Sequence, residues 1–299
     1  MKYRSTTLFV VLCALLVVLF VVDLLVGSVS IPLRDIFAAL LGGEVTPSTR
    51  LIVVDIRLVK AVVAVLAGMA LSVSGLQMQT LFRNPLAGPY VLGISSGASL
   101  GVALFILGMP LLGIATSSTI SSLGTAGAAW LGSALILAFV ASVSTRIKDI
   151  MVILILGMMI SSGVSAVVQI LQYLSNEEAL KSFVIWTMGS LGDVTSSQLM
   201  LLLPAVLIGL LVSVAVIKPL NWLLLGEQYA RTMGLNVRRS RYLIFLSTTL
   251  LAGTVTAFCG PIGFVGLAIP HIARMLFCNA DHRVLLPATA LCGAVVLLG

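Results

Sequence analysis

Long apolar runs, separated by short segments that carry most of the charge, recur along the whole chain. Nine of these runs are predicted to cross a bilayer as helices, which takes about 20 residues each. They lie near residues 7–27, 58–82, 90–108, 122–145, 150–172, 197–217, 242–259, 262–278 and 284–299. No stretch between them has the charge and turn density of a separate soluble domain, and the alternating pattern of a membrane β-barrel is absent. The pattern predicts a single all-α polytopic membrane domain over residues 1–299.

The segment from Leu66 to Gly101 interrupts the apolar pattern most strongly. Its candidate pathway residues are Gln77, Gln79, Asn84, Ser95 and Ser96. Polar side chains at membrane depth usually face protein or water, so this segment is predicted to form a wall of a translocation pathway. Gln77 and Gln79 are only two positions apart, so at most one is expected to face the lumen directly. The two serines either line the path or bond to their own helix backbone.

Glycine spacing predicts where helices approach one another closely. Gly93, Gly97 and Gly101 form two overlapping G-x-x-x-G steps, which place the three on one helix face. A faint repeat, Leu66–Gly75 against Leu251–Gly260, is compatible with two related halves, and transporters with repeats often place their substrate route between the halves.

Composition narrows the class of protein. Hydrophobic residues make up 60% of the chain, charged residues 9%, and mean hydropathy is +1.19. Soluble domains carry roughly 25% charged residues. The net charge of +7 does not indicate a nucleic-acid partner, because the basic residues cluster between the apolar runs, where they set topology.

The basic residues also predict orientation. Lys2 and Arg4 place the N-terminus in the cytoplasm, and the basic segments at 146–148 and 218–241 then fall on the same side. Most acidic residues fall outside. Arg57 and Lys60 are the basic residues on the unexpected side, which makes them candidates for a role outside the membrane.

Several chemistries lack their usual residues. There is no G-x-x-x-x-G-K-[ST] sequence, so the chain is not expected to hydrolyse nucleotide itself or to be an enzyme, and the energy of any active transport is expected to arrive through a partner. His271 has no second ligand at useful spacing, and no metal site or cofactor is predicted. Asp23 stands alone in span one; an ion-coupled secondary transporter that depends on this acid is the alternative class. Four widely spaced cysteines are expected to be small core residues: Cys13, Cys259, Cys278 and Cys292.

The loop at 220–241 differs from an ordinary turn. Gly226 and Gly234 bracket a segment of good helix formers, Glu227 to Met233, and Asn236 is a plausible N-cap for the next helix. A short helix presented outside the membrane suits docking to a partner protein. The competing interpretation is a solvated basic loop that only sets topology.

Four ordered blocks carry a family resemblance that covers essentially the whole chain. They are SGLQMQTLFRNPLAGPYVLGISSGASLG at 74–101, FVIWTMGSLGDVT at 183–195, LGEQYARTMGLNVRRSR at 225–241 and GPIGFVGLAIPHIARM at 260–275. The chain resembles the FecCD-like permease subunits of type II ABC importers for iron–siderophore, haem and vitamin B12. The resemblance implies a multi-pass protein of the bacterial cytoplasmic (inner) membrane. It also implies a second permease copy (a homodimer or a close paralogue), two cytoplasmic ATP-binding subunits and an extracytoplasmic substrate-binding protein.

The resemblance also implies roles for particular residues. The coupling segment that contacts the ATPase would contain Gly226, Glu227, Ala230, Met233 and Gly234, where Met233 replaces the commoner Leu. Arg57 and Lys60 match basic positions that dock the binding protein. Here Val59 and Lys60 replace Pro and Arg, which weakens bidentate pairing.

The family typically has ten membrane helices, and this chain stops in the ninth, so the resemblance implies a further helix. Iron(III)–siderophore is the expected cargo, with haem or cobalamin as alternatives.

Overall fold

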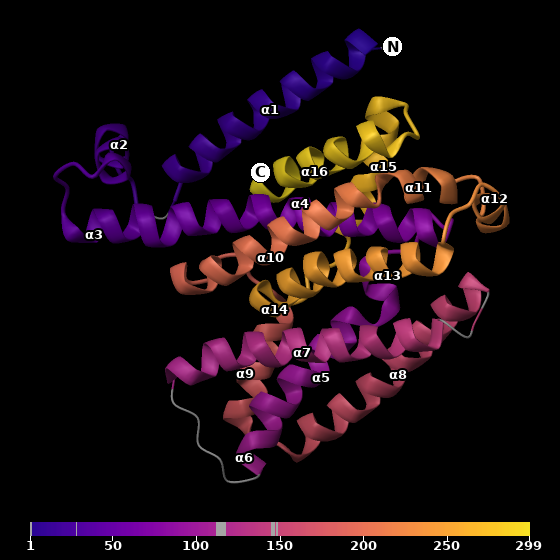
Figure 1. The fold of residues 1–299 in the computed structure, drawn as a ribbon. Helices are drawn as coiled ribbons and strands as arrows, with labels where there is room; N and C mark the ends of the chain where they lie inside the picture. The colour runs from indigo at the N-terminus through magenta and orange to yellow at the C-terminus, as the bar shows by residue number, and fades with distance from the viewer. Residues whose placement is uncertain (1, 28, 112–117, 145–146, 148) are drawn as a thin grey trace.

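The computed structural model describes residues 2–27, 29–111, 118–144, 147 and 149–299, and every regular element within these ranges is helical. Figure 1 shows the helices running largely side by side as one bundle. The longer elements are α1 (Lys2–Leu25), α4 (Val59–Leu81), α5 (Ile94–Ala103), α7 (Ser118–Ser144), α8 (Ile150–Leu174), α9 (Glu177–Met188), α10 (Ser196–Ala215), α13 (Val237–Thr248), α15 (Val265–Phe277) and α16 (His282–Leu298). The shorter ones are α2 (Leu33–Leu41), α3 (Pro47–Arg50), α6 (Met109–Leu111), α11 (Ile217–Leu223), α12 (Glu227–Thr232) and α14 (Thr254–Cys259), with a 3₁₀ turn, η2 (Pro89–Leu92).

Three π-helical stretches join helices without a break: η1 (Leu51–Leu58) leads into α4, η3 (Leu104–Gly108) extends α5, and η4 (Thr249–Gly253) links α13 to α14. Each predicted span therefore falls largely on helix, although Gly93 interrupts the span near 90–108 and the span near 262–278 becomes helical only at Val265. Five described helices are long and apolar enough to cross a membrane: Ser5–Leu25, Leu123–Ser144, Ile150–Leu174, Ser196–Ala215 and Val237–Cys259. Shorter apolar helices cover Ile94–Gly108, Val265–Phe277 and His282–Leu298. The all-α polytopic fold is confirmed.

Helix α4 forms the core of the bundle, with other helices on both sides of it (Figure 1). Nineteen of its 23 residues are buried, against three of 25 in α8. Its sequence explains this position, because alanine, glycine and serine recur around its whole circumference. Helix α8, by contrast, presents large apolar side chains outward, as a lipid-facing helix does.

Glycines set the closest helix contacts. A Cβ on Gly75 would overlap the carbonyl oxygen of Gly266 in α15, and a Cβ on Gly68 would overlap that of Gly293 in α16. On α5, a Cβ at Gly97 would lie 2.5 Å from the carbonyl oxygen of Gly132 in α7. Small residues thus let backbones touch, as G-x-x-x-G spacing predicts.

Gly93 differs from the other two glycines of that series. Its φ of +80° places it in the left-handed region, where it closes η2 and begins α5. A β-carbon is strained in this conformation, so Gly93 serves the turn, while Gly97 and Gly101 serve the packing. The predicted single glycine face is therefore confirmed for Gly97 and Gly101.

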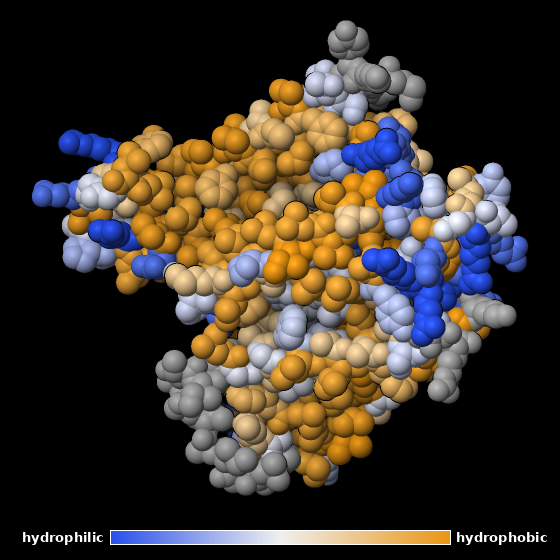
Figure 2. Space-filling model, in the orientation of Figure 1, coloured by the Kyte–Doolittle hydropathy of each residue, from blue (hydrophilic) through white to orange (hydrophobic). Residues whose placement is uncertain are grey.

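Two polar ends enclose an apolar belt, as Figure 2 shows on the visible face. One end contains α2 and α3 and is called the α2 end; the other contains α11 and α12 and is called the α12 end. Helices α2 and α9 were not predicted, because each is shorter than a membrane span and lies in a segment assigned to a loop. The side chains of Lys2 and Arg4, and residues Arg146 and Lys148, on which orientation was predicted, lie outside the described residues.

Candidate functional site

The segment between α10 and α13 folds into a separate short helix, α12, at the end of the bundle. Gly226 precedes it with a φ of +107° and Gly234 follows it with a φ of +87°. Both positions therefore need the conformational freedom of glycine. The Asn236 side chain accepts a hydrogen bond from the Arg239 backbone N–H and caps α13. The predicted bracketed helix and its following N-cap are confirmed as structure.

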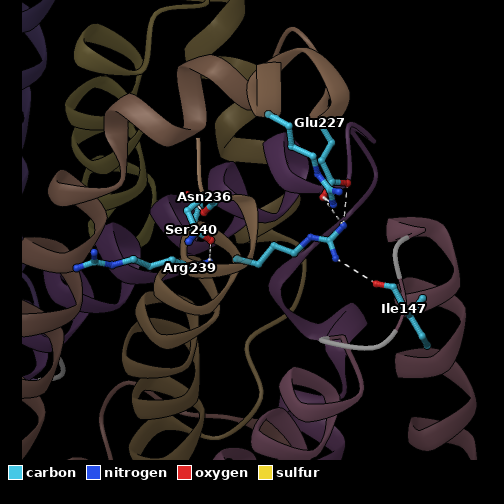
Figure 3. Close-up of polar contacts among 7 residues, drawn as sticks. Ile147, Glu227, Asn236, Arg239 and Ser240 are labelled. Carbon is cyan, nitrogen blue, oxygen red and sulfur yellow. Dashed lines mark hydrogen bonds and ion pairs between the residues drawn. The ribbon is translucent and has the colours of Figure 1, made fainter. Parts of the chain in front are cut away.

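One acidic side chain fixes α12 to the bundle. Nη2 of Arg241, in α13, donates to both Glu227 carboxylate oxygens at 2.8 Å, and Nη2 of Arg231 donates to one of them at 3.2 Å. Nη1 of Arg241 also donates to the carbonyl of Ile147, between α7 and α8, at 3.4 Å (Figure 3). The Arg241 side chain is 6% exposed and that of Glu227 24% exposed. A largely desolvated charge pair therefore joins α12 to α13, and Arg241 reaches the α7–α8 connection as well.

The opposite face of α12 is open to a partner. Ala230 is fully buried against the bundle, whereas Tyr229 and Met233 are 57% and 45% exposed. A β-carbon at Gly234 would meet no atom within 4 Å. The helix thus presents apolar and small residues on a surface that nothing in the described chain covers.

A polar groove of about 360 Å³ lies between α5, α8 and α9. Its polar lining consists of Ser95, Ser96, Ser99, Ser165, Gln169, Gln172 and Thr187. Val164, Val168 and Phe183 supply its apolar part. No charged side chain lines it among the described residues. The groove can make hydroxyl and amide contacts with a passing solute without binding it through an ion pair.

The groove contains two of the predicted pathway residues, Ser95 and Ser96, and adds others that sequence reasoning missed. Ser165, Gln169 and Gln172 follow i, i+4, i+7 spacing on α8 and so share one helix face. A polar stripe along an otherwise apolar span was the signal that could have identified them.

Gln77 and Gln79 both lie inside the subunit, with 0% and 3% exposure. Gln77 Nε2 donates to Ser247 Oγ at 3.0 Å, and Thr248 Oγ1 donates to Gln77 Oε1 at 3.2 Å, both from α13. Gln79 is bonded to α15: its Nε2 donates to a backbone carbonyl, and Arg274 Nη1 donates to its Oε1 at 2.6 Å. In this conformation both glutamines join α4 to its neighbours, and a contact with cargo stays a prediction for each.

Asn84 lies in the turn after α4. Its side-chain oxygen accepts the Leu86 backbone N–H at 2.9 Å and so stabilises the turn. The preceding residue, Arg83, has a φ of +48° and lies beside Gly226. This places Asn84 at the α12 end and outside the polar groove; its pathway role stays a prediction.

Arg57 and Lys60 occupy different environments. The Arg57 side chain is buried, and its guanidinium donates to the carbonyls of Leu24 and Leu25 at the end of α1 and of Val29 just beyond it. Lys60 Nζ pairs with Asp23 at 3.2 Å and its side chain stays 51% exposed. Asp23, the one acid in predicted span one, therefore has a basic partner. Of the two basic residues, Lys60 alone presents an accessible charge, and binding-protein docking stays a prediction for both.

A second polar network at the α12 end was not foreseen. The buried His282 ring bonds Thr80 Oγ1 at 2.9 Å and Asn221 Oδ1 at 2.8 Å. Asn221 Nδ2 donates to Asp281, which caps α16. The Arg283 backbone N–H and then the Asn221 amide hold the pKa of the Asp281 carboxyl below its ordinary value. The network connects α4, α11 and α16.

Metal ligands do not gather in the described part of the chain: no group of three or more His, Cys, Asp or Glu side chains lies close enough to hold an ion. His271 is exposed on α15.

An all-helical membrane bundle with an uncharged polar groove and a short exposed helix at one end fits the class of membrane transport proteins. The chain belongs to the FecCD transport family, whose model matches residues 15–299. It is 40% identical over 249 residues to the hemin transport system permease protein of Yersinia pestis. That alignment covers 82% of this chain and 72% of the relative. It is 35% identical over 294 residues to the molybdate import system permease protein of Haemophilus influenzae. That alignment covers 96% of this chain and 84% of the relative.

A solved structure described as an inward-facing metal-chelate type ABC transporter matches this fold with a TM-score of 0.83. The two share 32% identity, and the match covers 98% of this chain and 88% of the other.

Proposed function

We propose that this chain is the permease subunit of an ATP-driven importer and that α12 is the helix that receives the motion of two ATP-binding subunits. The observation that supports this most directly is α12 itself, a helix closed by two left-handed glycines, with a buried face and an uncovered face. In this assignment the α12 end is cytoplasmic and the α2 end faces outward. The coupling residues are Gly226, Glu227, Ala230, Met233 and Gly234.

The cargo would pass along the polar groove of α5, α8 and α9. Its hydroxyl and amide groups offer many weak contacts, and a transporter must not hold its cargo too tightly. A second permease copy, identical or closely related, would supply the opposite wall. ATP-driven displacement of α12 would reach the bundle through the Glu227–Arg241 pair.

A substrate-binding protein would dock at the α2 end. Lys60 is an exposed cation there, as are Arg34 and Arg50. It lies on the outer part of α4 and can pair with an acidic residue of that protein at the cost of its weak pair with Asp23. Arg57 would support this surface by holding the carbonyls that end α1.

We assign a metal chelate as the cargo class and an iron chelate as the first choice. The hemin relative and the metal-chelate neighbour support this assignment, whereas the molybdate relative makes an oxoanion the main competitor. Uptake of labelled ferric siderophore, hemin, cobalamin and molybdate by cells that express the complete transporter would separate these cargos.

Co-purification of an ATP-binding subunit tests the docking assignment. In Gly234→Arg a bulky cation enters open space on α12, so the subunit should fold while the partner is displaced. Gly42→Arg is the matched control, because Gly42 has a φ of +81° with no atom near its Cβ and lies at the α2 end. Both substitutions carry the same charge and a similar backbone strain of about 1–2 kcal/mol.

The expected result is loss of the ATP-binding subunit in Gly234→Arg alone, and ATP-driven uptake should disappear in that variant. Equal retention in both variants would remove α12 from the interface. Uptake that persists without any ATPase and depends on Asp23 would favour the ion-coupled alternative.

A further inference from the structure

A groove runs between helices α7 and α13 and is called the α7–α13 seam; residues of both helices line it. On α13 and the first residue of η4, the residues that face the seam are Arg238, Arg241, Tyr242, Phe245, Leu246 and Thr249. On α7 they run from Trp130 through Ala138 to Ser144. Both sets follow helical i, i+3, i+4 spacing, so each forms one continuous stripe. Further into the bundle α7 packs on η4 and α14, but beside α13 it leaves a groove.

The end of this groove nearest α12 is basic. A pocket of about 370 Å³ lies there between the α7–α8 connection and the start of α13. Its described lining contains three arginines, Arg231, Arg238 and Arg241, and one acid, Glu227. Ser144 and Asn236 add uncharged polar groups. Since Glu227 offsets one of the three cations, the pocket keeps a net positive charge.

The rest of the groove is apolar. Next along the same two helices lies a second pocket of about 420 Å³, lined by Ser142 on α7 and Tyr242 on α13, which are close in sequence to Ser144 and Arg241 of the basic pocket. Trp130 and Tyr242 are each 38% exposed there, and Leu246 is 49% exposed.

We propose that this seam binds one anionic phospholipid from the leaflet at the α12 end, with its phosphate among the arginines and an acyl chain in the apolar pocket. Basic pockets between membrane helices are suited to anionic headgroups. The apolar continuation argues for a lipid over free phosphate, which has no chain to fill it. The site lies beside the Glu227–Arg241 pair, so an occupied site adds a negative charge next to the joint between α12 and α13.

Tryptophan quenching measures this binding directly, because Trp130 lines the apolar pocket. The full chain with Trp186→Phe and Trp222→Phe retains Trp130 as its only tryptophan. In vesicles of phosphatidylcholine, dibrominated phosphatidylglycerol is compared with dibrominated phosphatidylcholine as quencher. We expect the anionic lipid to be preferred at Trp130 by about fivefold or more, the effect of one or two net basic residues.

Two matched pairs of variants locate the site. Arg238→Gln should reduce the preference about fivefold, whereas Arg239→Gln, next to it in sequence, should not change it. Figure 3 shows Arg239 pointing away from Glu227 and Ile147. Ala138→Phe should fill the apolar pocket and remove the preference, and Leu135→Phe, 70% exposed and outside the pocket lining, should leave it intact.

Equal quenching by both lipids would mean annular lipid only and would overturn the proposal. So would equal losses in the two arginine variants, which indicate general surface charge, or recovery of fluorescence on adding inorganic phosphate. If Arg238→Gln weakens retention of the ATP-binding subunit while lipid preference stays unchanged, the basic pocket belongs to that partner instead. None of these outcomes depends on the result of the Gly234→Arg test, because the lipid site requires only that the chain lies in a membrane.

Discussion

The Glu227–Arg241 pair offers the sharpest test of how α12 is held. Glu227→Gln keeps the side-chain shape but leaves the nearly buried Arg241 guanidinium without its counter-charge. Removing one partner of a fully buried pair costs about 3–5 kcal/mol. Glu227 is 24% exposed, so water screens part of the loss, and we expect about 2 kcal/mol. Arg231→Gln removes only the i,i+4 contact of a half-exposed side chain and should cost about 0.5 kcal/mol or less.

Unfolding midpoints of the purified full chain in detergent would measure both variants. A double-mutant cycle of Glu227→Gln with Arg241→Gln then isolates the pair energy. ATP-driven uptake should fall with the pair energy, because a loosened α12 transmits less displacement to α13. A coupling energy below about 0.5 kcal/mol, or equal losses in Glu227→Gln and Arg231→Gln, would show that the pair does not fix α12.

The remaining predictions concern packing, the outer surface and the groove. Gly75→Ala should destabilise the chain by about 1–3 kcal/mol, because its Cβ overlaps the α15 backbone. Gly163→Ala, which has open space around it, should instead stabilise the folded chain by up to about 1 kcal/mol. Thermal unfolding measures both variants, and equal effects would contradict the packing. Arg57→Gln should cost about 2–3 kcal/mol in thermal unfolding, because it removes the donor to the buried Leu24 carbonyl and to the partly buried carbonyls of Leu25 and Val29. Lys60→Glu should barely change stability but weaken binding-protein affinity severalfold in a titration, and unchanged affinity would exclude Lys60 from docking. Gln169→Leu should slow cargo uptake severalfold while ATPase retention and unfolding stay unchanged, and normal uptake would remove the groove from the path.

Local chemistry made the helices and the α12 loop predictable. Apolar runs located the spans within a few residues, and the glycine brackets and Asn236 acted through neighbours in sequence. Burial of Arg57 was not predictable, because its carbonyl partners lie about 30 residues away. The interior positions of Gln77 and Gln79 depend on α13 and α15, about 170 to 195 residues later. Sequence spacing reports which residues share a helix face, but the partner of that face is fixed only by the folded bundle.

The contacts also indicate how motion at α12 would spread. Glu227 joins α12 to α13, and Gln77 joins α13 to the central helix α4, which touches α15 and α16 through glycine contacts. Helices α5 and α7 form a separate close-packed pair through Gly97 and Gly132. We therefore expect α13 and α4 to move together against α5 and α7, which deforms the α7–α13 seam. Distances between spin labels across that seam should then change with nucleotide state, while labels on α4 and α16 should keep their separation; a change within the second pair would show that the bundle does not divide there.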